Sequence, residues 1–425
     1  MQSLTRSHFA ACCTASGGVG MKESPQNDAT ACGPLSGYRV VDISHHMAGP
    51  AATQKLGDFG ADVVKVEPPG AGEWTRTRPI GDSWVGDVNT SFLSLNRNKR
   101  SIGINLKDAE GYDLFCELVT AADVIVVNFR PEVCRRLRVD YETLQHVNPR
   151  LIYCSVTGFG GTGPHSGRPG QDLLIQAFSG LTWNGGVEGG PPVPAPTFIA
   201  DSTTGNQAVI GILAALLARQ KTGMGQQVEV NLLSSMMDVQ IQELTTYLNT
   251  GNLPHRSSER LAHPLINAPY GIHRTADGWI AVAMAEPATL AEALGLPKLA
   301  QFIEWTEGFA HRDEIFRAVA EVLATLTTEE AITELDRHAV WCGRVNTYAD
   351  LAHDPQVLHN GMIQSVPGRN GTDLQLIGSP IQFSSTPSSI RTCPPELGEH
   401  TDEILAEFGI SAAKAATLRA AGAIQ

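Results

Sequence analysis

Several features that mark common protein classes are missing from this chain of 425 residues. No apolar run approaches the ~20 residues that a membrane-spanning helix needs, so we expect no membrane span. Positive charge is scarce: 31 basic against 44 acidic residues give a formal net charge of −13, which argues against general binding of nucleic acids or anionic membranes. This balance does not exclude a phosphorylated small molecule held by a local basic cluster.

Motifs of metal, redox and hydrolase sites are also missing. The eight cysteines are scattered without a C-x-x-C pair, which predicts reduced thiols and neither a disulfide framework nor a zinc site. The thirteen histidines show no H-E-x-x-H spacing, so we expect no metal centre. A G-x-S-x-G elbow is absent, which argues against a serine hydrolase. What is present is the composition of a soluble globular protein, with 42% hydrophobic and 18% charged residues.

Residues 1–33 form a leader rich in Ser, Ala, Thr and Gly, without the hydrophobic periodicity of a core segment. We expect this leader to be disordered. It contains Arg6 and no acidic residue before Glu23, a composition shared with transit peptides, although a translation start at Met21 explains it as well. We therefore expect a cytoplasmic protein, and a mitochondrial one if the leader is a transit peptide.

Strands and helices alternate from Gly37 onward. Strand 38–43, helix 50–59 and strand 61–66 form a βαβ unit, which implies a parallel sheet with helices on its faces. The alternation continues with strands at 101–106, 123–127, 151–156 and 227–230, and with helices at 109–121, after 130, from 171, from 208 and at 232–249. The pattern predicts the α/β class with a Rossmann-like sheet, although the first turn, 44–49, is no G-x-G-x-x-G fingerprint. Ligands are expected at the carboxyl ends of the strands.

A polar stretch interrupted by prolines, residues 251–269, predicts a linker. After it, strand 278–284 and helices near 287–294, 313–326 and 328–338 indicate a smaller α+β domain. We expect three parts: a large domain over 34–250, the linker and small domain over 251–358, and a return segment over 359–425. The last is too short for a core of its own and should complete the large domain.

Two aspartates stand at the predicted starts of apolar helices. Asp201 precedes the helical run from 208 and occupies the place of an N-terminal cap, a role that Asp fills often. The positive end of the helix dipole also favours an anion there, and an ionised carboxylate can attack an acyl carbon. Asp172 follows the glycine-rich loop 158–170 in the same way. Within residues 198–207, Asp201 is therefore either an N-terminal helix cap or a catalytic nucleophile.

Basic residues gather near the predicted strand ends. They comprise Lys99, Arg100, Lys107 and the arginines between 130 and 138. In an acidic protein this grouping indicates an anion site, and the alternative is a set of solvated surface charges.

Motifs spread over the chain resemble those of CoA-transferase family III. They are Val40-Val41-Asp42-Ile43 with Ala48-Gly49-Pro50, the run 56–67, Asn98-Lys99-Arg100-Ser101, Asn128-Phe129-Arg130-Pro131, Phe198 to Gly205, Gly378-Ser379-Pro380 and the run 397–403. The resemblance covers residues 34–425. The family includes formyl-CoA and crotonobetainyl-CoA:carnitine CoA-transferases and α-methylacyl-CoA racemases.

The resemblance implies an acyl-CoA:carboxylate CoA-transferase that works through an aspartyl mixed anhydride and an aspartyl-CoA thioester. Asp201 falls on the family's nucleophile, with Asp172 positioning the acceptor or assisting proton movement. A CoA thioester is then a substrate, no cofactor is bound permanently, and the partners are an acyl-CoA donor, a carboxylate acceptor and a second copy of the chain in an interlinked homodimer. The implied CoA contacts are His46, Met47, Lys107, Asn128, Phe129 and Arg136. With a reference pKa of ~3.9, Asp201 is expected to be ionised at pH 7.

Two alternatives accompany this interpretation. The racemases keep their aspartate in a G-H-D motif, and this chain has Gly170-Gln171-Asp172, so an α-methylacyl-CoA racemase would use Asp172 as its acid/base. No clear second acid/base partner is visible, which favours transfer. A catalytically silent acyl-CoA-binding relative is the other alternative, and the intact Asp201 argues against it.

An oxalate/formate activity is disfavoured because Met47 and Pro68 replace the glutamine and arginine of formyl-CoA transferase, and its glycine-run lid is missing.

Overall fold

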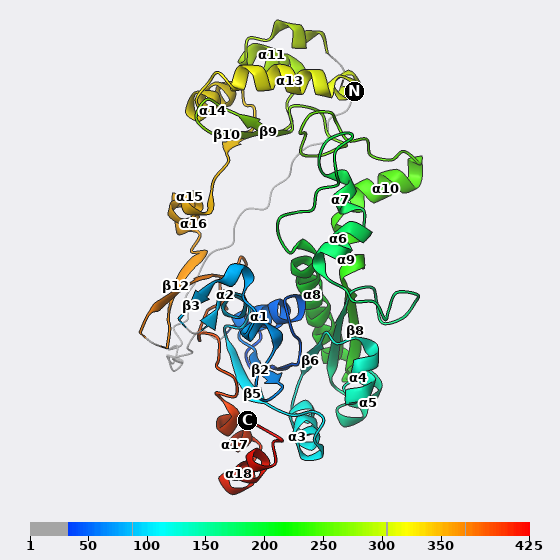
Figure 1. Ribbon diagram of the computed structural model, residues 1–425, viewed down its shortest axis with the longest axis vertical. Coiled ribbons are helices and arrows are strands. Elements are labelled where there is room, and N and C mark those ends of the chain that lie inside the picture. The colour runs from blue at the N-terminus through cyan, green and yellow to red at the C-terminus, as the bar shows by residue number, and fades with distance from the viewer. Residues whose placement is uncertain (1–32, 87, 303–304, 370) are drawn as a thin grey trace, which may run out of the picture.

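The computed structural model describes residues 33–86, 88–302, 305–369 and 371–425 (Figure 1). The predicted leader, apart from Gly33, lies outside the described residues. Across the described ranges, no helix combines the length and the apolar character that crossing a membrane requires.

A six-stranded sheet is the centre of the larger part of the protein. In spatial order its strands are β5 (Lys99–Gly103), β2 (Asp62–Glu67), β1 (Arg39–Asp42), β6 (Val124–Val127), β7 (Ile152–Thr157) and β8 (Gln226–Asn231). Every neighbouring pair is parallel. The predicted α/β class with a parallel sheet is confirmed, and each strand predicted for it overlaps an observed one.

Apolar side chains on both faces explain why these strands lie inside the molecule. Successive residues of a strand point to opposite faces, and Val40 and Val41 accordingly pack into two different core clusters. One face is covered by α3 (Ala109–Thr120), α5 (Tyr141–Val147), α17 (Thr401–Glu407) and α18 (Ala412–Ala420), and the other by α1 (Ala48–Asp58), α8 (Ile199–Thr222) and α9 (Leu232–Val239). Burial on both faces is the reason for the near-continuous apolar runs in the sequence.

A separate core lies within residues 268–340. Its elements are the antiparallel strands β9 (Gly271–Arg274), β10 (Trp279–Val282) and β11 (Cys342–Arg344) with helices α11 (Pro287–Ala293), α13 (Arg312–Leu323) and α14 (Thr328–Arg337). Figure 1 shows them grouped away from the six-stranded sheet. The predicted smaller α+β unit is therefore present, and β9 and β11 are strands that the sequence pattern did not predict.

The remaining elements are short. They are α2 (Thr90–Leu95), α4 (Pro131–Leu137), α6 (Asp172–Phe178), α7 (Leu181–Asn184), α10 (Ile241–Thr250), α12 (Trp305–Ala310), α15 (Tyr348–His353), α16 (Pro355–His359), three single-turn helices (Trp74–Arg76, Ile80–Asp82 and Pro297–Gln301), and the antiparallel pairs β3 (Trp84–Val85) with β4 (Val88–Asn89) and β12 (Ile363–Pro367) with β13 (Asp373–Ile377). The C-terminal residues return to the large sheet: Arg391 N–H donates to Asn98 Oδ1 at 2.6 Å, and Gln425 N–H donates to Gly103 O at 3.0 Å.

Two predicted boundaries were wrong for identifiable reasons. The single helix predicted over 232–249 is two helices, because Gln240 leaves helical geometry (φ −101°, ψ 28°) and its side-chain amide donates to Met236 O at 2.9 Å. The strand predicted over 101–106 begins earlier, at Lys99. Lys99 was expected to bind an anion or to be a solvated surface charge, but its side chain is fully buried against Asp42.

Candidate active site

The strand order of the large sheet reverses between β1 and β6, and the segments that follow these two strands meet there. Asn128, directly after β6, accepts from His45 N–H at 2.9 Å through Oδ1 and donates to His45 O at 2.6 Å. The rings of His45 and Phe129 meet edge to face, with centroids 5.2 Å apart. Such a reversal is the usual ligand crevice of a parallel α/β sheet. The sequence-predicted residues His46, Met47, Asn128 and Phe129 are thereby brought together.

Side chains from three segments hold the backbone of this turn. Ser44 N–H donates to Asp42 Oδ1 at 2.9 Å, and His46 N–H donates to Glu73 Oε2 at 3.1 Å, while Asn128 holds His45. His46 has φ +67°, a left-handed conformation that non-glycine residues adopt rarely, and its exposed ring packs on Trp74 with centroids 4.8 Å apart. The turn is therefore fixed in shape before any ligand arrives.

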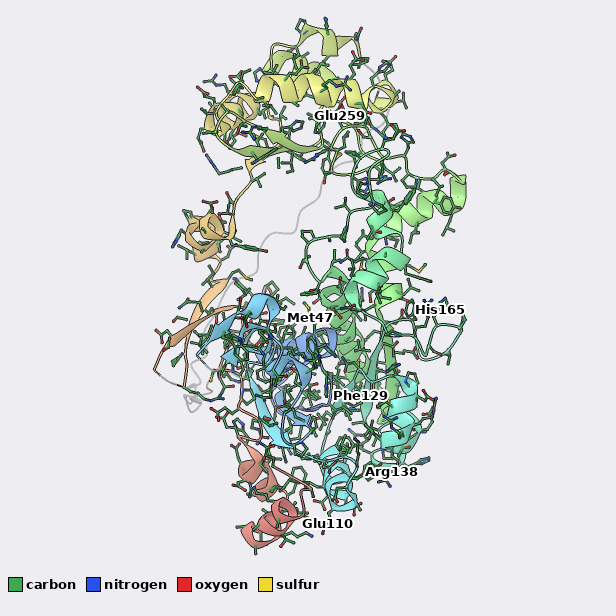
Figure 2. All side chains as sticks on the ribbon, viewed as in Figure 1. Met47, Glu110, Phe129, Arg138, His165 and Glu259 are labelled. Carbon is green, nitrogen blue, oxygen red and sulfur yellow. The ribbon has the colours of Figure 1, made fainter. Side chains whose placement is uncertain are left out.

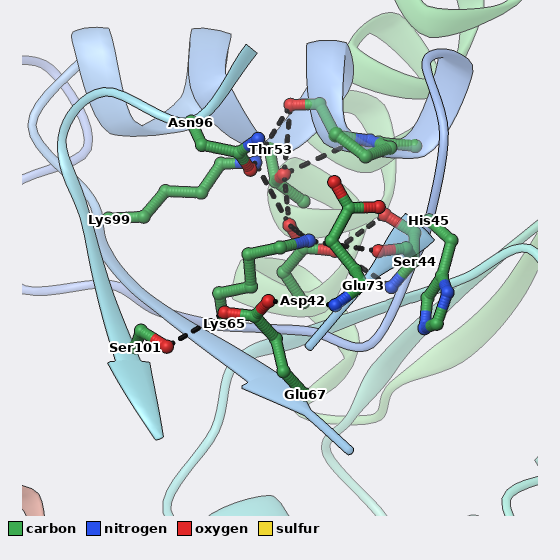
Figure 3. Close-up of polar contacts among 12 residues, drawn as sticks. Asp42, Ser44, His45, Thr53, Lys65, Glu67, Glu73, Asn96, Lys99 and Ser101 are labelled. Carbon is green, nitrogen blue, oxygen red and sulfur yellow. Dashed lines mark hydrogen bonds and ion pairs between the residues drawn. The ribbon is translucent and has the colours of Figure 1, made fainter. Parts of the chain in front are cut away.

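Beneath the turn lies a cluster of charged side chains with almost no exposure, which we call the buried ionic cluster: Asp42, Lys65, Glu67, Glu73 and Lys99 (Figure 3). Asp42 Oδ2 lies 3.0 Å from Lys99 Nζ and 3.7 Å from Lys65 Nζ. Lys99 Nζ also donates to Asn96 Oδ1 and Pro50 O, and Lys65 Nζ donates to Ser44 O at 3.0 Å. The cluster thus connects β1, β2 and β5 to the start of α1.

Burial and charge oppose each other in this cluster. Burial by itself raises the pKa of Asp42, yet Lys65 and Lys99 hold that pKa below its usual value. Burial lowers the pKa of Lys99 to about 8, because Asp42 offsets only part of the desolvation. For Lys65 the neighbouring carboxylates outweigh burial and raise the pKa. Burial, with a contribution from Lys65, lowers the pKa of His45 to about 4, so this ring is neutral at pH 7.

Asp201 lies in the first turn of α8 and does not cap it. The N-cap residue is Phe198, and the Asp201 N–H is accepted by Asp172 Oδ2 of α6 at 3.0 Å. The predicted capping role of Asp201 was therefore wrong. Helix α8 already begins at Ile199, two residues before Asp201, and the Asp201 N–H is accepted by the Asp172 carboxylate of α6. Among the described residues nothing donates a hydrogen bond to the Asp201 carboxylate itself, which leaves its oxygens free to react.

The expectation that Asp201 is ionised at pH 7 holds only for part of the molecules. Burial, with a contribution from the negative charge of Asp172, raises the pKa of Asp201 to about 7. The helix dipole favours the anion there, but this stabilisation amounts to only ~0.3–1 kcal/mol at most exposed sites. A part of the carboxyl groups is consequently protonated at neutral pH.

Asp172 is almost fully buried and is itself held on both oxygens. Gln176 Nε2 donates to Asp172 Oδ1 at 2.6 Å, and Gln176 Oε1 accepts from Ala195 N–H at 2.9 Å. The glycine-rich loop before α6 closes tightly, since a Cβ on Gly158 would lie 2.4 Å from Gly170 Cα. This pair fixes where α6 begins, and Asp172 links α6, the loop before α8 and the Asp201 backbone.

The two halves of the candidate site lie on helices in direct contact. Gly205 is one helical turn after Asp201, and a Cβ there would lie 2.9 Å from Ala48 O, the first residue of α1. Glycine allows this close approach of α8 to α1. The Asp201 turn and the 44–47 turn are thereby positioned against each other.

The predicted basic cluster divides into two groups. Lys99 belongs to the buried ionic cluster, and Arg100 forms a two-point ion pair with Asp62 at 2.9 and 2.7 Å, so the prediction that these two hold an anion was wrong. Lys107 and Arg136 are exposed and line a cavity of about 260 Å³ with Leu106, Leu137 and Arg138. Figure 2 labels Arg138. The described residues contain no group of three His, Cys, Asp or Glu side chains that could hold a metal ion.

The fold is a six-stranded parallel α/β sheet, and the candidate site, with Asp201 in the first turn of α8, lies beside the strand reversal at which such sheets bind ligands. The sequence model of CoA-transferase family III matches residues 35–401, and the chain belongs to this family. The predicted membership is confirmed, and the protein is an enzyme of the CoA-transferase type.

The chain is similar to several characterised proteins. It is 35% identical to the succinyl-CoA:glutarate CoA-transferase of Homo sapiens, over 90% of this chain and 88% of that protein. It is 33% identical to the formyl-CoA:oxalate CoA-transferase of Streptomyces avermitilis, over 92% of this chain and 99% of that protein. Among solved structures, a CAIB/BAIF family protein from Brucella suis superposes with a TM-score of 0.77 and 34% identity, covering 88% of this chain and 99% of that one.

Replacing Lys99 with Met, which is close to it in length, should destabilise the fold strongly. Removing one partner of a buried ion pair leaves an uncompensated charge and typically costs ~3–5 kcal/mol. Urea unfolding of Lys99→Met and of the wild type measures the loss in free energy of unfolding. Lys414→Met is the matched control, because Lys414 is paired with Glu110 at the surface, where pairs contribute at most ~1 kcal/mol. Equally small losses of unfolding free energy in Lys99→Met and Lys414→Met would show that the buried ionic cluster contributes little to the stability of the fold.

Proposed function

We propose that this protein moves CoA from an acyl-CoA donor to a carboxylic acid acceptor, with Asp201 as the nucleophile. The observation that carries the proposal is the Asp201 carboxylate, which has no hydrogen-bond donor among the described residues and stands on a helix that packs on the start of α1. The similar proteins named above transfer CoA between carboxylic acids, which supports the same reaction class here.

The reaction needs no general base, because every nucleophile in it is an anion. The Asp201 carboxylate attacks the donor thioester carbon and expels CoA thiolate, which leaves a mixed anhydride. The thiolate attacks the aspartyl carbonyl and releases the donor acid, giving an aspartyl-CoA thioester. The acceptor carboxylate attacks the aspartyl carbon of this thioester and expels CoA thiolate, which leaves a second mixed anhydride. The thiolate then attacks the acceptor carbonyl of this anhydride, which forms the new acyl-CoA and releases the Asp201 carboxylate. Water must be excluded throughout, since it would hydrolyse each intermediate.

Asp172 acts in this proposal as a positioning residue. Both of its oxygens are used, one on the Asp201 N–H and one on Gln176, so it has little capacity to bind an acceptor or to carry a proton to a substrate. The same engagement disfavours the racemase alternative, which requires a free acid/base at this position. The CoA contacts at His46, Met47, Lys107, Phe129 and Arg136 belong to the proposal. Asn128 acts through the His45 backbone, which takes up its amide oxygen and nitrogen.

Succinyl-CoA is the first donor to test. Relatives from Homo sapiens, Agrobacterium fabrum and Chloroflexus aurantiacus carry succinyl-CoA or succinate in their names, paired with glutarate or L-malate. A screen of succinyl-CoA against a panel of mono- and dicarboxylic acids identifies the acceptor.

A homodimer belongs to the same proposal, because apolar side chains remain exposed on α6, α8, α9 and α10. They are Leu173, Leu174 and Phe178 on α6, Ile210 and Leu217 on α8, Met237 and Val239 on α9, and Ile241 and Leu248 on α10. Exposed apolar surface of this extent marks an interaction site. A second copy of the chain, interlinked with the first as the family resemblance implies, would cover it and exclude water from Asp201.

Asp201→Asn should fold and bind CoA while losing transfer by several orders of magnitude, because the amide lacks the anionic nucleophile. In the wild type, acyl-CoA followed by hydroxylamine should leave a hydroxamate on Asp201, detected as a mass change on its peptide. Asp113→Asn, an exposed position on α3, is the control and should behave as wild type. An Asp201→Asn enzyme with near-normal transfer contradicts the proposal.

Transfer should decline as the pH falls through about 7, because protonation removes the Asp201 nucleophile and its pKa is raised to about 7. Asp172 is the one charged neighbour that contributes to this shift within the described part of the chain. Asp172→Asn keeps an oxygen for the Asp201 N–H but removes the charge, so the midpoint of the pH–rate profile should move to lower pH. A midpoint that stays in place would show that burial alone sets this pKa.

Sedimentation at low micromolar concentration should give about twice the 45.4 kDa chain mass. Ile241→Asp together with Leu248→Asp, at side chains that are 61% and 75% exposed in the single chain, should shift the population toward monomer and reduce activity. A wild-type enzyme that is monomeric and fully active would refute the dimer proposal.

A further inference from the structure

The cavity beside α4 carries three positive side chains: Lys107, Arg136 and Arg138. All three are exposed, and within the described residues none of them forms an ion pair with a carboxylate. Most other arginines near the large sheet are paired, as Arg100 is with Asp62. Three unpaired cations around one cavity repel one another and favour an anion as their occupant.

Arg138 has an unfavourable backbone conformation. It ends α4 in the left-handed region, at φ 58° and ψ 34°, where glycine is strongly preferred. The helix end fixes this geometry: Arg138 N–H donates to Arg135 O at 3.1 Å, and Val139 N–H donates to Cys134 O at 2.9 Å. The backbone therefore does not favour an arginine here, which directs attention to what its side chain contacts.

The Arg138 side chain is held in place by Tyr112. Its guanidinium carbon lies 3.6 Å from the centre of the Tyr112 ring, and the Tyr112 hydroxyl donates to Arg138 O at 2.9 Å. Tyr112 is 7% exposed, so the ring is a rigid support. A guanidinium stacked on a ring keeps its edge N–H groups available, and these suit two-point binding of a phosphate.

We propose that Arg138 is a third phosphate-binding residue, and that together with Lys107 and Arg136 it selects a phosphomonoester dianion, the 3′-phosphate of CoA. This inference rests on the proposed function. The two bridging phosphates of CoA carry about one negative charge each, whereas a phosphomonoester carries about −1.5 to −2 at pH 7. Three converging cations match the phosphate with the highest charge. The proposal adds a selectivity residue to the predicted pair of Lys107 and Arg136.

The test compares CoA with 3′-dephospho-CoA by calorimetric titration of the wild type and of Arg138→Gly. Glycine suits the left-handed backbone, so this variant should fold, with a melting temperature within roughly 2 °C of the wild type, because the relief of strain offsets the lost stacking on Tyr112. CoA affinity should fall roughly 10- to 100-fold, as expected for one charge-assisted contact. The affinity for dephospho-CoA should change less than about twofold. Ala339→Gly, at another exposed residue with positive φ (55°), should leave both affinities unchanged.

The outcomes separate this inference from the proposed function. A wild type that binds neither ligand contradicts the proposed function itself. A wild type that binds CoA, with Arg138→Gly binding it equally well, overturns the role of Arg138 and leaves the proposed function standing. If Arg138→Gly loses affinity for CoA and for dephospho-CoA by the same factor, the assignment of Arg138 to the 3′-phosphate is overturned.

Discussion

The pairing of Asp42 with Lys65 and Lys99 is the constraint on which the candidate site depends. These fully buried charges lie on β1, β2 and β5, and they connect the sheet to the turn that contains His45 and His46. Burying such charges is expensive, and hydrophobic side chains of similar volume would often give equal or greater stability. The arrangement is better explained by geometry: Asp42 accepts the Ser44 N–H, and Lys65 donates to Ser44 O, so the charges hold the turn in one conformation.

Hydrophobic periodicity was sufficient to predict the parallel sheet, and buried charge explains why the start of β5 was missed. Apolar runs such as Val124–Val127 are buried on both faces and are recognisable without a structure. Lys65 and Lys99 are buried as completely as those four residues, but a lysine in a sequence is read as a surface residue. Their burial depends on partners that are 23 and 57 positions away from them along the chain. For the same reason, the start of β5 could not be placed from the sequence.

The candidate site residues stay a prediction, and the structure adds contacts among them that the sequence did not indicate. Asp201, Asp172, Asn128 and Lys107 were all identified from motifs, because a family resemblance preserves residue identity. Their contacts depend on side-chain directions that no spacing encodes. Asn128 uses its amide on the His45 backbone, and Asp172 caps a turn of a helix 29 positions away. Arg138 was visible in the sequence only as one of several basic residues, since its stacking on Tyr112 joins two distant segments.

Burial and the helix dipole act on Asp201 in opposite directions, and their magnitudes decide its protonation. The rise of its pKa from 3.8 to about 7 corresponds to ~4 kcal/mol in favour of the protonated form, whereas a helix N-terminus returns up to ~2 kcal/mol to the anion. Burial therefore prevails in the free chain. A carboxylate destabilised in this way is a stronger nucleophile once ionised, because its negative charge is less well solvated. The burial that raises the pKa of Asp201 thus also makes its anion reactive, and a thioester carbon that accepts this electron pair relieves the unfavourable charge.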